Sequence, residues 1–239
     1  MATSLRYWAI IPAAGTSQRM GAETPKQYLP LADTTVIEAS LSNFLCHPKV
    51  AGIVVALHAD DQYWNTLALK HNEKIHTVMG GESRAESVYN AIRYLENTPA
   101  ANDDFLLVHD AARPCLRKTD LDLLIQQLEQ DDVGGILASP VCDTLKIIEQ
   151  QAETNNIVCK TPDRKKIWRA FTPQMFRLST LKNALTHCKK NNIIVTDEAS
   201  AVEALGLPVK LITGQSDNIK ITNPEDLVLA SAIYQKINN

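Results

Sequence analysis

The sequence lacks the features that would place the protein in a membrane or on a nucleic acid. No apolar run approaches the ~18 residues that span a bilayer, and the N-terminal stretch MATSLRYWAIIPAAG has the wrong length and flanks for a signal peptide. The net charge is only -3, so a general affinity for nucleic acid is not expected. We therefore expect a cytoplasmic globular protein with no membrane or nucleic-acid partner.

Disulfide and metal-binding patterns are also missing. The five cysteines are odd in number, widely spread and never in C-x-x-C spacing, which favours neither a disulfide scaffold nor a zinc site. We expect them to be buried, inert thiols. No histidine lies in H-E-x-x-H spacing, and His109, at the end of an apolar run, is expected to be a core residue rather than a catalytic base.

The two best-known phosphate-binding loops are absent from the segment AIIPAAGTSQRMGAETPKQY (9–28). Its glycines complete neither G-x-x-x-x-G-K-[ST] nor G-x-G-x-x-G, which argues against a NAD-dependent oxidoreductase. The segment does combine three small residues at 13–15, which let the backbone approach a ligand closely, with the cations Arg19 and Lys26. We expect it to bind an anion.

Short apolar runs alternate with longer amphipathic ones in this 239-residue chain, of which 45% is hydrophobic. We expect strands at 8–13, 50–57, 75–79, 104–109, 133–141, 208–213 and around 218–221, and helices at 35–45, 60–70, 83–97, 120–130, 178–189, 196–205 and from about 224. Such alternation predicts an α/β fold with a parallel sheet and right-handed crossovers. One domain over 1–239 is expected.

The alternation is interrupted at 141–170. This stretch contains two extended runs around a polar turn at 150–156, which predicts a β-hairpin or arm. Because an arm of this kind cannot bury itself, we expect it to contact a second chain.

Four polar or glycine-rich clusters directly follow apolar strands. They are PAAGTSQRM (12–20), GGESRAES (80–87), HDAARP (109–114) and DNIK (217–220). In an open parallel sheet, ligands bind beyond the carboxyl ends of the strands. The clusters therefore predict a binding site at that edge of the sheet, with Ser83 as a helix N-cap.

Taken together, the motifs resemble the 2-C-methyl-D-erythritol 4-phosphate cytidylyltransferases. In order, these motifs are PAAGTSQRMGAETPKQY, GGESRAESV, VHDAARP, DTLK, TPDR, WRAFTPQMF, TDEASA and DNIKITNPEDL, and they extend from about Trp8 to the last helix. The resemblance implies a three-layer α/β fold, nucleotide-diphospho-sugar transferase-like, with a mainly parallel twisted sheet and a protruding β-arm. It also implies transfer of CMP from CTP to 2-C-methyl-D-erythritol 4-phosphate in non-mevalonate isoprenoid biosynthesis. The products are 4-diphosphocytidyl-2-C-methyl-D-erythritol and pyrophosphate.

The resemblance also implies roles for individual residues. Arg19, Lys26 and Lys220 match the catalytic cations. Pro12, Ala13, Ala14, Gly15, Gly80, Gly81, Glu82, Ser87, Asp110 and Ala111 match the nucleotide site. Arg113, Thr144, Arg164 and Thr172 match the site for the phosphate substrate, with Arg164 on the arm of a homodimer reaching the neighbouring subunit.

Magnesium, or another divalent cation, fits this chemistry because substrate phosphates usually hold such an ion with few protein ligands. Asp110 is a candidate either for the metal shell or for a substrate hydroxyl, and the sequence does not separate the two.

One residue departs from the family pattern. Ser17 stands where the family loop usually has a second glycine, and if that position needs a positive φ, serine costs about 1 kcal/mol. Two alternatives stay open. A ribitol 5-phosphate cytidylyltransferase would favour D-A-V-R-P where this chain has D-A-A-R-P at 110–114. A non-catalytic nucleotide-binding regulator would not need both Lys26 and Lys220.

Overall fold

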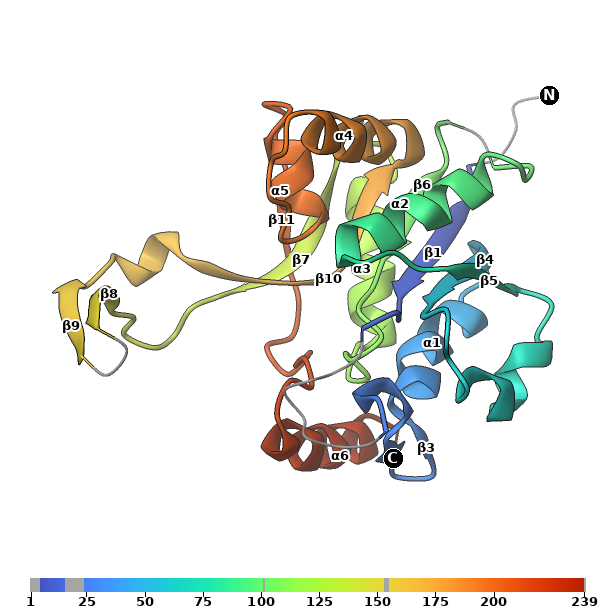
Figure 1. Ribbon diagram of the computed structural model, residues 1–239, viewed down its shortest axis with the longest axis horizontal. Coiled ribbons are helices and arrows are strands. Elements are labelled where there is room, and N and C mark those ends of the chain that lie inside the picture. The colour runs from blue at the N-terminus through green and yellow to red at the C-terminus, as the bar shows by residue number, and fades with distance from the viewer. Residues whose placement is uncertain (1–4, 16–23, 101, 153–154, 239) are drawn as a thin grey trace.

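The computed structural model describes residues 5–15, 24–100, 102–152 and 155–238. Its centre is a sheet with the strand order β11-β7-β10-β6-β1-β4-β5 (Figure 1). These strands are β1 (Tyr7–Pro12), β4 (Val50–Leu57), β5 (Ile75–Met79), β6 (Phe105–Val108), β7 (Gly134–Pro140), β10 (Trp168–Arg177) and β11 (Lys210–Thr213). Two short strands, β2 (Pro30–Leu31) and β3 (Thr34–Thr35), form a separate pair.

The sheet is mainly parallel, as the sequence predicts. Strand β1 pairs in parallel with β4 and β6, β4 with β5, and β7 with β11, whereas β10 runs antiparallel between β6 and β7. The prediction that the arm extends to residue 170 is wrong at its end, because β10 already pairs with β7 from Trp168 onwards. The buried run 171–176 inserts the rest of this strand into the sheet.

Helices cover both faces of the sheet (Figure 1). They are α1 (Val36–Cys46), α2 (Arg84–Leu95), α3 (Lys118–Leu128), α4 (Leu178–Lys190), α5 (Glu198–Glu203) and α6 (Pro224–Asn238). Alternate residues of β1 point to opposite faces, as a strand requires: Ile11 packs in one core with α1 and α3, and Ile10 in another with α2, α4 and α5. The result is the predicted three-layer arrangement, with α6 packed on a third, smaller cluster beside α1.

The predicted helix at 60–70 is wrong. The chain forms two short 3-10 helices instead, η3 (Trp64–Thr66) and η4 (Ala68–His71), separated by the extended residue Leu67. Asp61 caps this turn by accepting hydrogen bonds from the backbone of Tyr63 and Trp64. The break allows both Trp64 and Leu67 to be buried in the core, which outweighs continuous helical hydrogen bonding here.

The predicted strand around 218–221 is also wrong. Asn218 and Ile219 donate their backbone N–H groups to nearby residues of the same turn, and Ile221 alone donates to a neighbouring segment, at the carbonyl of Ala112. Local turn bonds therefore replace strand pairing.

The expectation that all five cysteines are buried is wrong for three of them. Cys115 and Cys188 are buried, but Cys46, Cys142 and Cys159 are exposed.

Residues 147–160 form the predicted hairpin. Strands β8 (Ile147–Ala152) and β9 (Asn155–Lys160) pair antiparallel as a sheet of their own, and Figure 1 shows this pair well away from the central sheet. Another 3-10 turn, η5 (Arg164–Lys166), leads back to β10.

Among the described residues, no helix is long and apolar enough to cross a membrane.

Candidate active site

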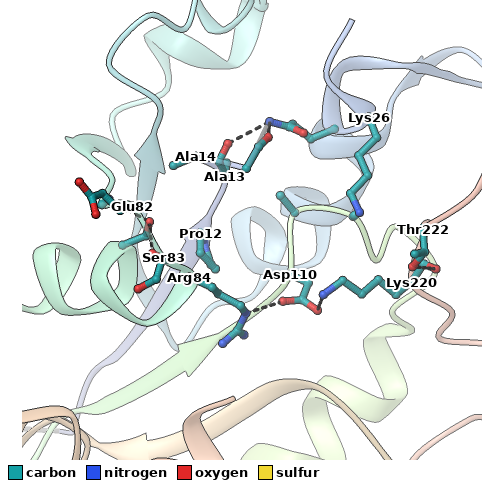
Figure 2. Close-up of a pocket in the computed structure, with 16 residues that line it drawn as sticks. Pro12, Ala13, Ala14, Lys26, Glu82, Ser83, Arg84, Asp110, Lys220 and Thr222 are labelled. Atoms are coloured by element: carbon teal, nitrogen blue, oxygen red, sulfur yellow. Dashed lines mark hydrogen bonds and ion pairs between the residues drawn. The ribbon is translucent and has the colours of Figure 1, made fainter. Parts of the chain in front are cut away.

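A cavity of about 500 Å³ opens beyond the carboxyl ends of β1 and β6, next to the first turn of α2 (Figure 2). It is lined by Pro12, Ala13, Ala14, Gly15, Lys26, Gln27, Gly81, Glu82, Ser83, Arg84, Ser87, Asp110, Ala111, Ala112, Lys220 and Thr222. The site thus lies where the topology of a parallel sheet predicts it. Four regions of the sequence supply its wall: the first in two parts, at 12–15 and 26–27, and the others at 81–87, 110–112 and 220–222.

The first of these segments, residues 13–15, is fixed from two sides. The Ala13 N–H donates to the carbonyl of Ala56 at 2.8 Å, which continues the pairing of β1 with β4. The side chain of Gln27, in the 3-10 turn η2 (Lys26–Tyr28), donates to the carbonyl of Ala13 at 2.9 Å. Gln27 is therefore a positioning residue that no sequence pattern predicts. Its neighbour Lys26 lines the cavity, while the predicted Arg19, like Ser17, lies outside the described residues.

The second segment joins β5 to α2. Ser83 caps α2 by accepting a hydrogen bond from the N–H of Glu86, as predicted. The buried Ser87 hydroxyl accepts from the N–H of Gly81 at 3.0 Å. A Cβ at Gly80 would stand 2.4 Å from the Cβ of Ala14, so only glycine allows this close approach of the first two segments. Gly80 lines an adjoining hollow rather than the main cavity.

Asp110 is the centre of the polar network. Its Oδ1 accepts from Nε of Arg84 at 2.9 Å, and its Oδ2 accepts from Nζ of Lys220 at 3.0 Å and from Nε of Arg113 at 3.3 Å. The residue is 7% exposed. Burial disfavours the carboxylate, but the charges of Arg84, Lys220 and Arg113 outweigh it and keep the pKa of Asp110 well below its usual range. Asp110 is therefore an anion that three cations share.

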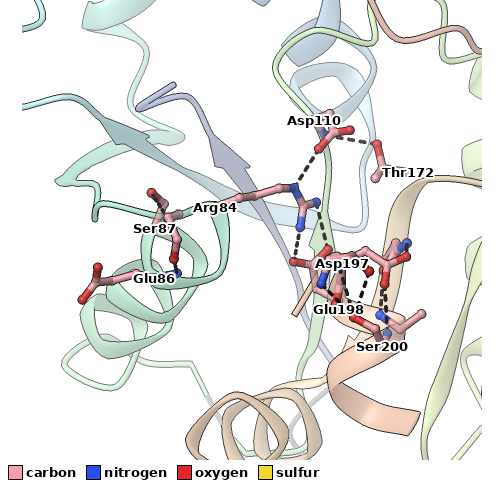
Figure 3. Close-up of polar contacts among 12 residues, drawn as sticks. Arg84, Glu86, Ser87, Asp110, Thr172, Asp197, Glu198 and Ser200 are labelled. Carbon is pink, nitrogen blue, oxygen red and sulfur yellow. Dashed lines mark hydrogen bonds and ion pairs between the residues drawn. The ribbon is translucent and has the colours of Figure 1, made fainter. Parts of the chain in front are cut away.

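Arg84 connects this network to α5 (Figure 3). Its guanidinium donates from Nη1 and Nη2 to the two carboxylate oxygens of Glu198, at 2.6 and 2.9 Å. Burial disfavours the charge, yet the two carboxylates raise the pKa of Arg84 further above its ordinary value. Neither Arg84 nor Glu198 has a role predicted from the sequence, although they stand in the motifs GGESRAES and TDEASA.

A second layer of polar groups lies behind Asp110. The Thr172 hydroxyl accepts from the backbone N–H of Asp110 at 3.1 Å. The side-chain amide of Asn218 donates to the backbone carbonyl of Thr172, and the backbone carbonyl of Asn218 accepts from Nη1 of Arg113. The predicted substrate residues Arg113 and Thr172 are thus joined to Asp110, but neither lines the cavity.

Two further predicted residues, Thr144 and Arg164, lie elsewhere. Both are exposed on the segment that carries the arm and are absent from the cavity wall. Nη1 of Arg164 donates to the carbonyl of Cys142 at 2.6 Å. Within one chain they do not join the site, so the expected role of Arg164 across a dimer stays a prediction.

Comparison with known proteins identifies the family. Residues 7–236 match the profile of the family described as "IspD: 2-C-methyl-D-erythritol 4-phosphate cytidylyltransferase". Relatives of that name from Pseudomonas syringae pv. tomato and Pseudomonas putida are each 52% identical over 221 residues, which is 92% of both chains. The crystal structure of the Francisella tularensis 2-C-methyl-D-erythritol 4-phosphate cytidylyltransferase matches with a TM-score of 0.82 at 38% identity, covering 95% of this chain and 99% of the other. The chain therefore belongs to the 2-C-methyl-D-erythritol 4-phosphate cytidylyltransferase family.

Proposed function

We propose that the cavity beside Asp110 is where this chain binds CTP and transfers its cytidylyl group. As a member of the family, the protein catalyses CTP-dependent cytidylyl transfer to 2-C-methyl-D-erythritol 4-phosphate in isoprenoid biosynthesis. The observation that carries the assignment to this cavity is the placement of two lysines. Lys26 and Lys220 come from distant segments, and in Figure 2 their side chains point into the same region beside Asp110.

The reaction needs positioning and positive charge more than acid–base groups. An oxygen of the substrate phosphate attacks the α-phosphorus of CTP, and the bond to the pyrophosphate oxygen breaks. A phosphate monoester has a second pKa of about 6, so the nucleophile is ionised at neutral pH without a general base. Two anions must approach each other, and charge then grows on the leaving pyrophosphate, which cations in a cavity stabilise.

The cations then divide between the α-phosphate and the leaving pyrophosphate. Lys26 and Lys220 neutralise the oxygens of the α-phosphate from two sides. The salt bridge to Asp110 fixes Lys220 before the nucleotide arrives, which lowers the entropy lost in the transition state. Arg19 is assigned to the departing phosphates by the family resemblance alone.

The cytosine and ribose fit the wall formed by residues 80–87. Gly80, Gly81, Glu82 and Ser87 present backbone and small polar groups there, and the hydrogen bond from Gly81 to Ser87 fixes the loop. Pro12, Ala13, Ala14, Gly15 and Ala111 leave room for the nucleotide because their side chains are small or absent.

The phosphate substrate is proposed to bind on the Arg113 side of Asp110, completed by a second chain. The hairpin exposes Ile147, Ile148, Ile157 and Val158, an apolar surface that favours contact with another protein. We propose a homodimer in which Thr144 and Arg164 of one chain complete the substrate site of its partner. The planar guanidinium of an arginine suits a phosphate.

The cavity fits a magnesium ion that is held mainly by the substrates. The described residues contain no group of three His, Cys, Asp or Glu side chains placed to hold a metal, and both oxygens of Asp110 accept from cations. Its carboxylate and that of Glu82 are the acidic groups among the described lining residues. When bound, Mg²⁺ would neutralise charge on the triphosphate.

Pyrophosphate release tests this function. Purified protein is supplied with CTP, Mg²⁺ and either 2-C-methyl-D-erythritol 4-phosphate or ribitol 5-phosphate, with Lys220→Ala as the site control. We expect turnover with the first substrate, at least tenfold slower turnover with the second, and a strong loss in the variant. Faster turnover with ribitol 5-phosphate would overturn the substrate assignment, and an unimpaired Lys220→Ala variant would overturn the site assignment.

A further inference from the structure

Glu198 is fully buried and does not line the cavity, yet it contacts a residue that does. Its two oxygens accept from both terminal nitrogens of Arg84, while the third nitrogen of the same guanidinium, Nε, donates to Asp110 (Figure 3). One planar group thus joins two carboxylates and fixes the rotation of Asp110. Such bidentate geometry specifies orientation as well as charge.

The position of Glu198 is itself fixed by hydrogen bonds to the sheet. Asp197 caps α5 in a capping box with Ser200. Gln174 of β10 donates to Oδ2 of Asp197 at 2.9 Å and accepts from the N–H of Ala199 at 2.9 Å. Because β10 also carries Thr172, which accepts from the backbone of Asp110, Glu198 and Asp110 are held by one strand.

Helix stability does not explain an arginine at position 84. Arg84 is the first residue of α2, where the partial positive charge of the helix N-terminus disfavours a cation. The two carboxylates compensate for this, and one of them, Asp110, belongs to the site. The placement of Arg84 therefore points to a role in arranging the site.

The charges around Asp110 show what Glu198 contributes. Arg84, Arg113 and Lys220 all bind Asp110, so three cations share one anion. Glu198 supplies a second negative charge to Arg84. Without it, Arg84 would draw Asp110 towards itself and repel Lys220 more strongly, since buried charges are weakly screened.

We propose that Glu198 and Arg84 are positioning residues for the transfer reaction, which orient Asp110 and through it place Lys220 beside the α-phosphate. This inference rests on the proposed function. It predicts that the charge of Glu198 affects turnover although Glu198 touches no substrate. A residue that merely stabilised the fold would affect nucleotide binding and the amount of folded protein instead.

The test is a double-mutant cycle between Glu198→Gln and Lys220→Ala, with Glu203→Gln as the matched control. Glu203 lies in the same helix but is exposed. We expect Glu198→Gln to lower kcat about tenfold or more, as misplacement of a reacting group does, while the Kd for CTP stays the same or falls because the cavity gains net positive charge. In the Lys220→Ala background, the same change should lower kcat less than about threefold, because residues acting as a unit are not additive. Glu203→Gln should leave kcat unchanged.

The outcomes distinguish a failure of the proposed function from a failure of the positioning role alone. A wild-type chain without activity on CTP and 2-C-methyl-D-erythritol 4-phosphate overturns the proposed function and this inference with it. Two results overturn the inference alone, provided that the wild type is active and Lys220→Ala is slow. One is an equal loss of kcat from Glu198→Gln in both backgrounds, and the other is a Glu198→Gln variant with normal kcat. If Glu198→Gln does not fold, Arg84→Lys is taken through the same cycle with the same expected losses of kcat in the two backgrounds, because a lysine keeps the charge but cannot bind both carboxylates.

Discussion

The Thr172 hydroxyl lies 3.0 Å from Nδ1 of His109, and the other ring nitrogen of His109 lies 3.0 Å from the carbonyl oxygen of Arg113. Because that carbonyl can only accept, Nε2 carries the proton and Nδ1 accepts from Thr172. Thr172 in turn accepts from the N–H of Asp110. The neutral histidine is thus a structural support behind the site, which agrees with the expectation that it is a core residue.

This arrangement predicts a loss of stability in mild acid. Burial lowers the pKa of His109 from 6.5 to about 4, despite the hydrogen bond to Arg113. Between these values the unfolded chain binds a proton here and the folded chain does not, so stability falls as the pH falls from about 6.5 towards 4. From this group, the free energy of unfolding should be about 2 kcal/mol lower at pH 5 than at pH 7.5. Urea denaturation at the two pH values measures it.

The His109→Asn variant is the control for this prediction. Asparagine keeps an acceptor for Thr172 but does not titrate, so the difference in the free energy of unfolding between the two pH values should shrink by about 2 kcal/mol. Asp110 does not interfere, because its carboxyl has a pKa well below the usual range and the unfolded carboxyl titrates near 3.8. An unchanged pH dependence in the variant would show that His109 is not the group responsible.

Replacing the lysines of the cavity tests their assigned roles. Lys26→Ala and Lys220→Ala should each lower kcat by about a hundredfold, since each removes a cation that stabilises the transition state. Steady-state kinetics with saturating CTP measures this, with the exposed Lys236 of α6 replaced by alanine as a control. A variant that retains near-normal kcat would remove that lysine from the mechanism.

The sequence predicts most of the sheet because its strands are continuously apolar and separated by turn residues. It fails where tertiary contacts override a local pattern. Residues 60–70 have helical periodicity, but burying both Trp64 and Leu67 breaks the helix. Strand β10 contains Pro173 and polar residues, a composition that argues against a central strand. It lies within the sheet nevertheless, because its register with β7 shifts between Ala170 and Gln174 and so accommodates the proline.

Site residues can be predicted from the sequence where they follow an apolar strand, and not where only a tertiary contact brings them to the site. Lys220 and Asp110 follow apolar runs, and the rule for parallel sheets places such residues at one edge. Glu198 follows no strand, and its distance of 114 residues from Arg84 gives no pattern in a single sequence. The motif TDEASA carries a capping signal with Asp197 that locates a helix start, but it does not reveal that the next residue faces an arginine in another helix.

Gly80 offers a test of the close approach between two loops. An added Cβ would stand 2.4 Å from the Cβ of Ala14 and 3.1 Å from the carbonyl oxygen of Leu57, so Gly80→Ala should lower the free energy of unfolding by about 1–3 kcal/mol. It should also weaken CTP binding at least tenfold by displacing residues 13–15. An added Cβ at Gly15 would have no atom of the described residues within 4 Å, so Gly15→Ala should change stability by less than about 1 kcal/mol. Equal stability losses would contradict the steric explanation.

The proposed dimer makes a prediction that separates action within one chain from action across two. Arg164 is exposed and outside the cavity of its own chain, so Arg164→Ala should raise KM for the phosphate substrate at least tenfold while Kd for CTP is unchanged. Isothermal titration with each ligand, combined with kinetics, checks this.

Mixing two impaired variants decides where Arg164 acts. In a heterodimer of Arg164→Ala and Lys220→Ala chains, the cavity of the Arg164→Ala chain keeps its own Lys220 and would receive an intact Arg164 from the partner chain. The other cavity lacks both. The mixture is assayed with the phosphate substrate below the wild-type KM, where the Arg164→Ala chain is nearly inactive. Chains mixed after unfolding and refolding together should then regain substantial activity, approaching a quarter of the wild-type value if pairing is random, because half of the dimers contain one intact site in two. If Arg164 acts on the cavity of its own chain, every site in the mixture lacks either Arg164 or Lys220, and the activity stays at the average of the two variants. That result would exclude a site shared between subunits even if the chain proves to be a dimer.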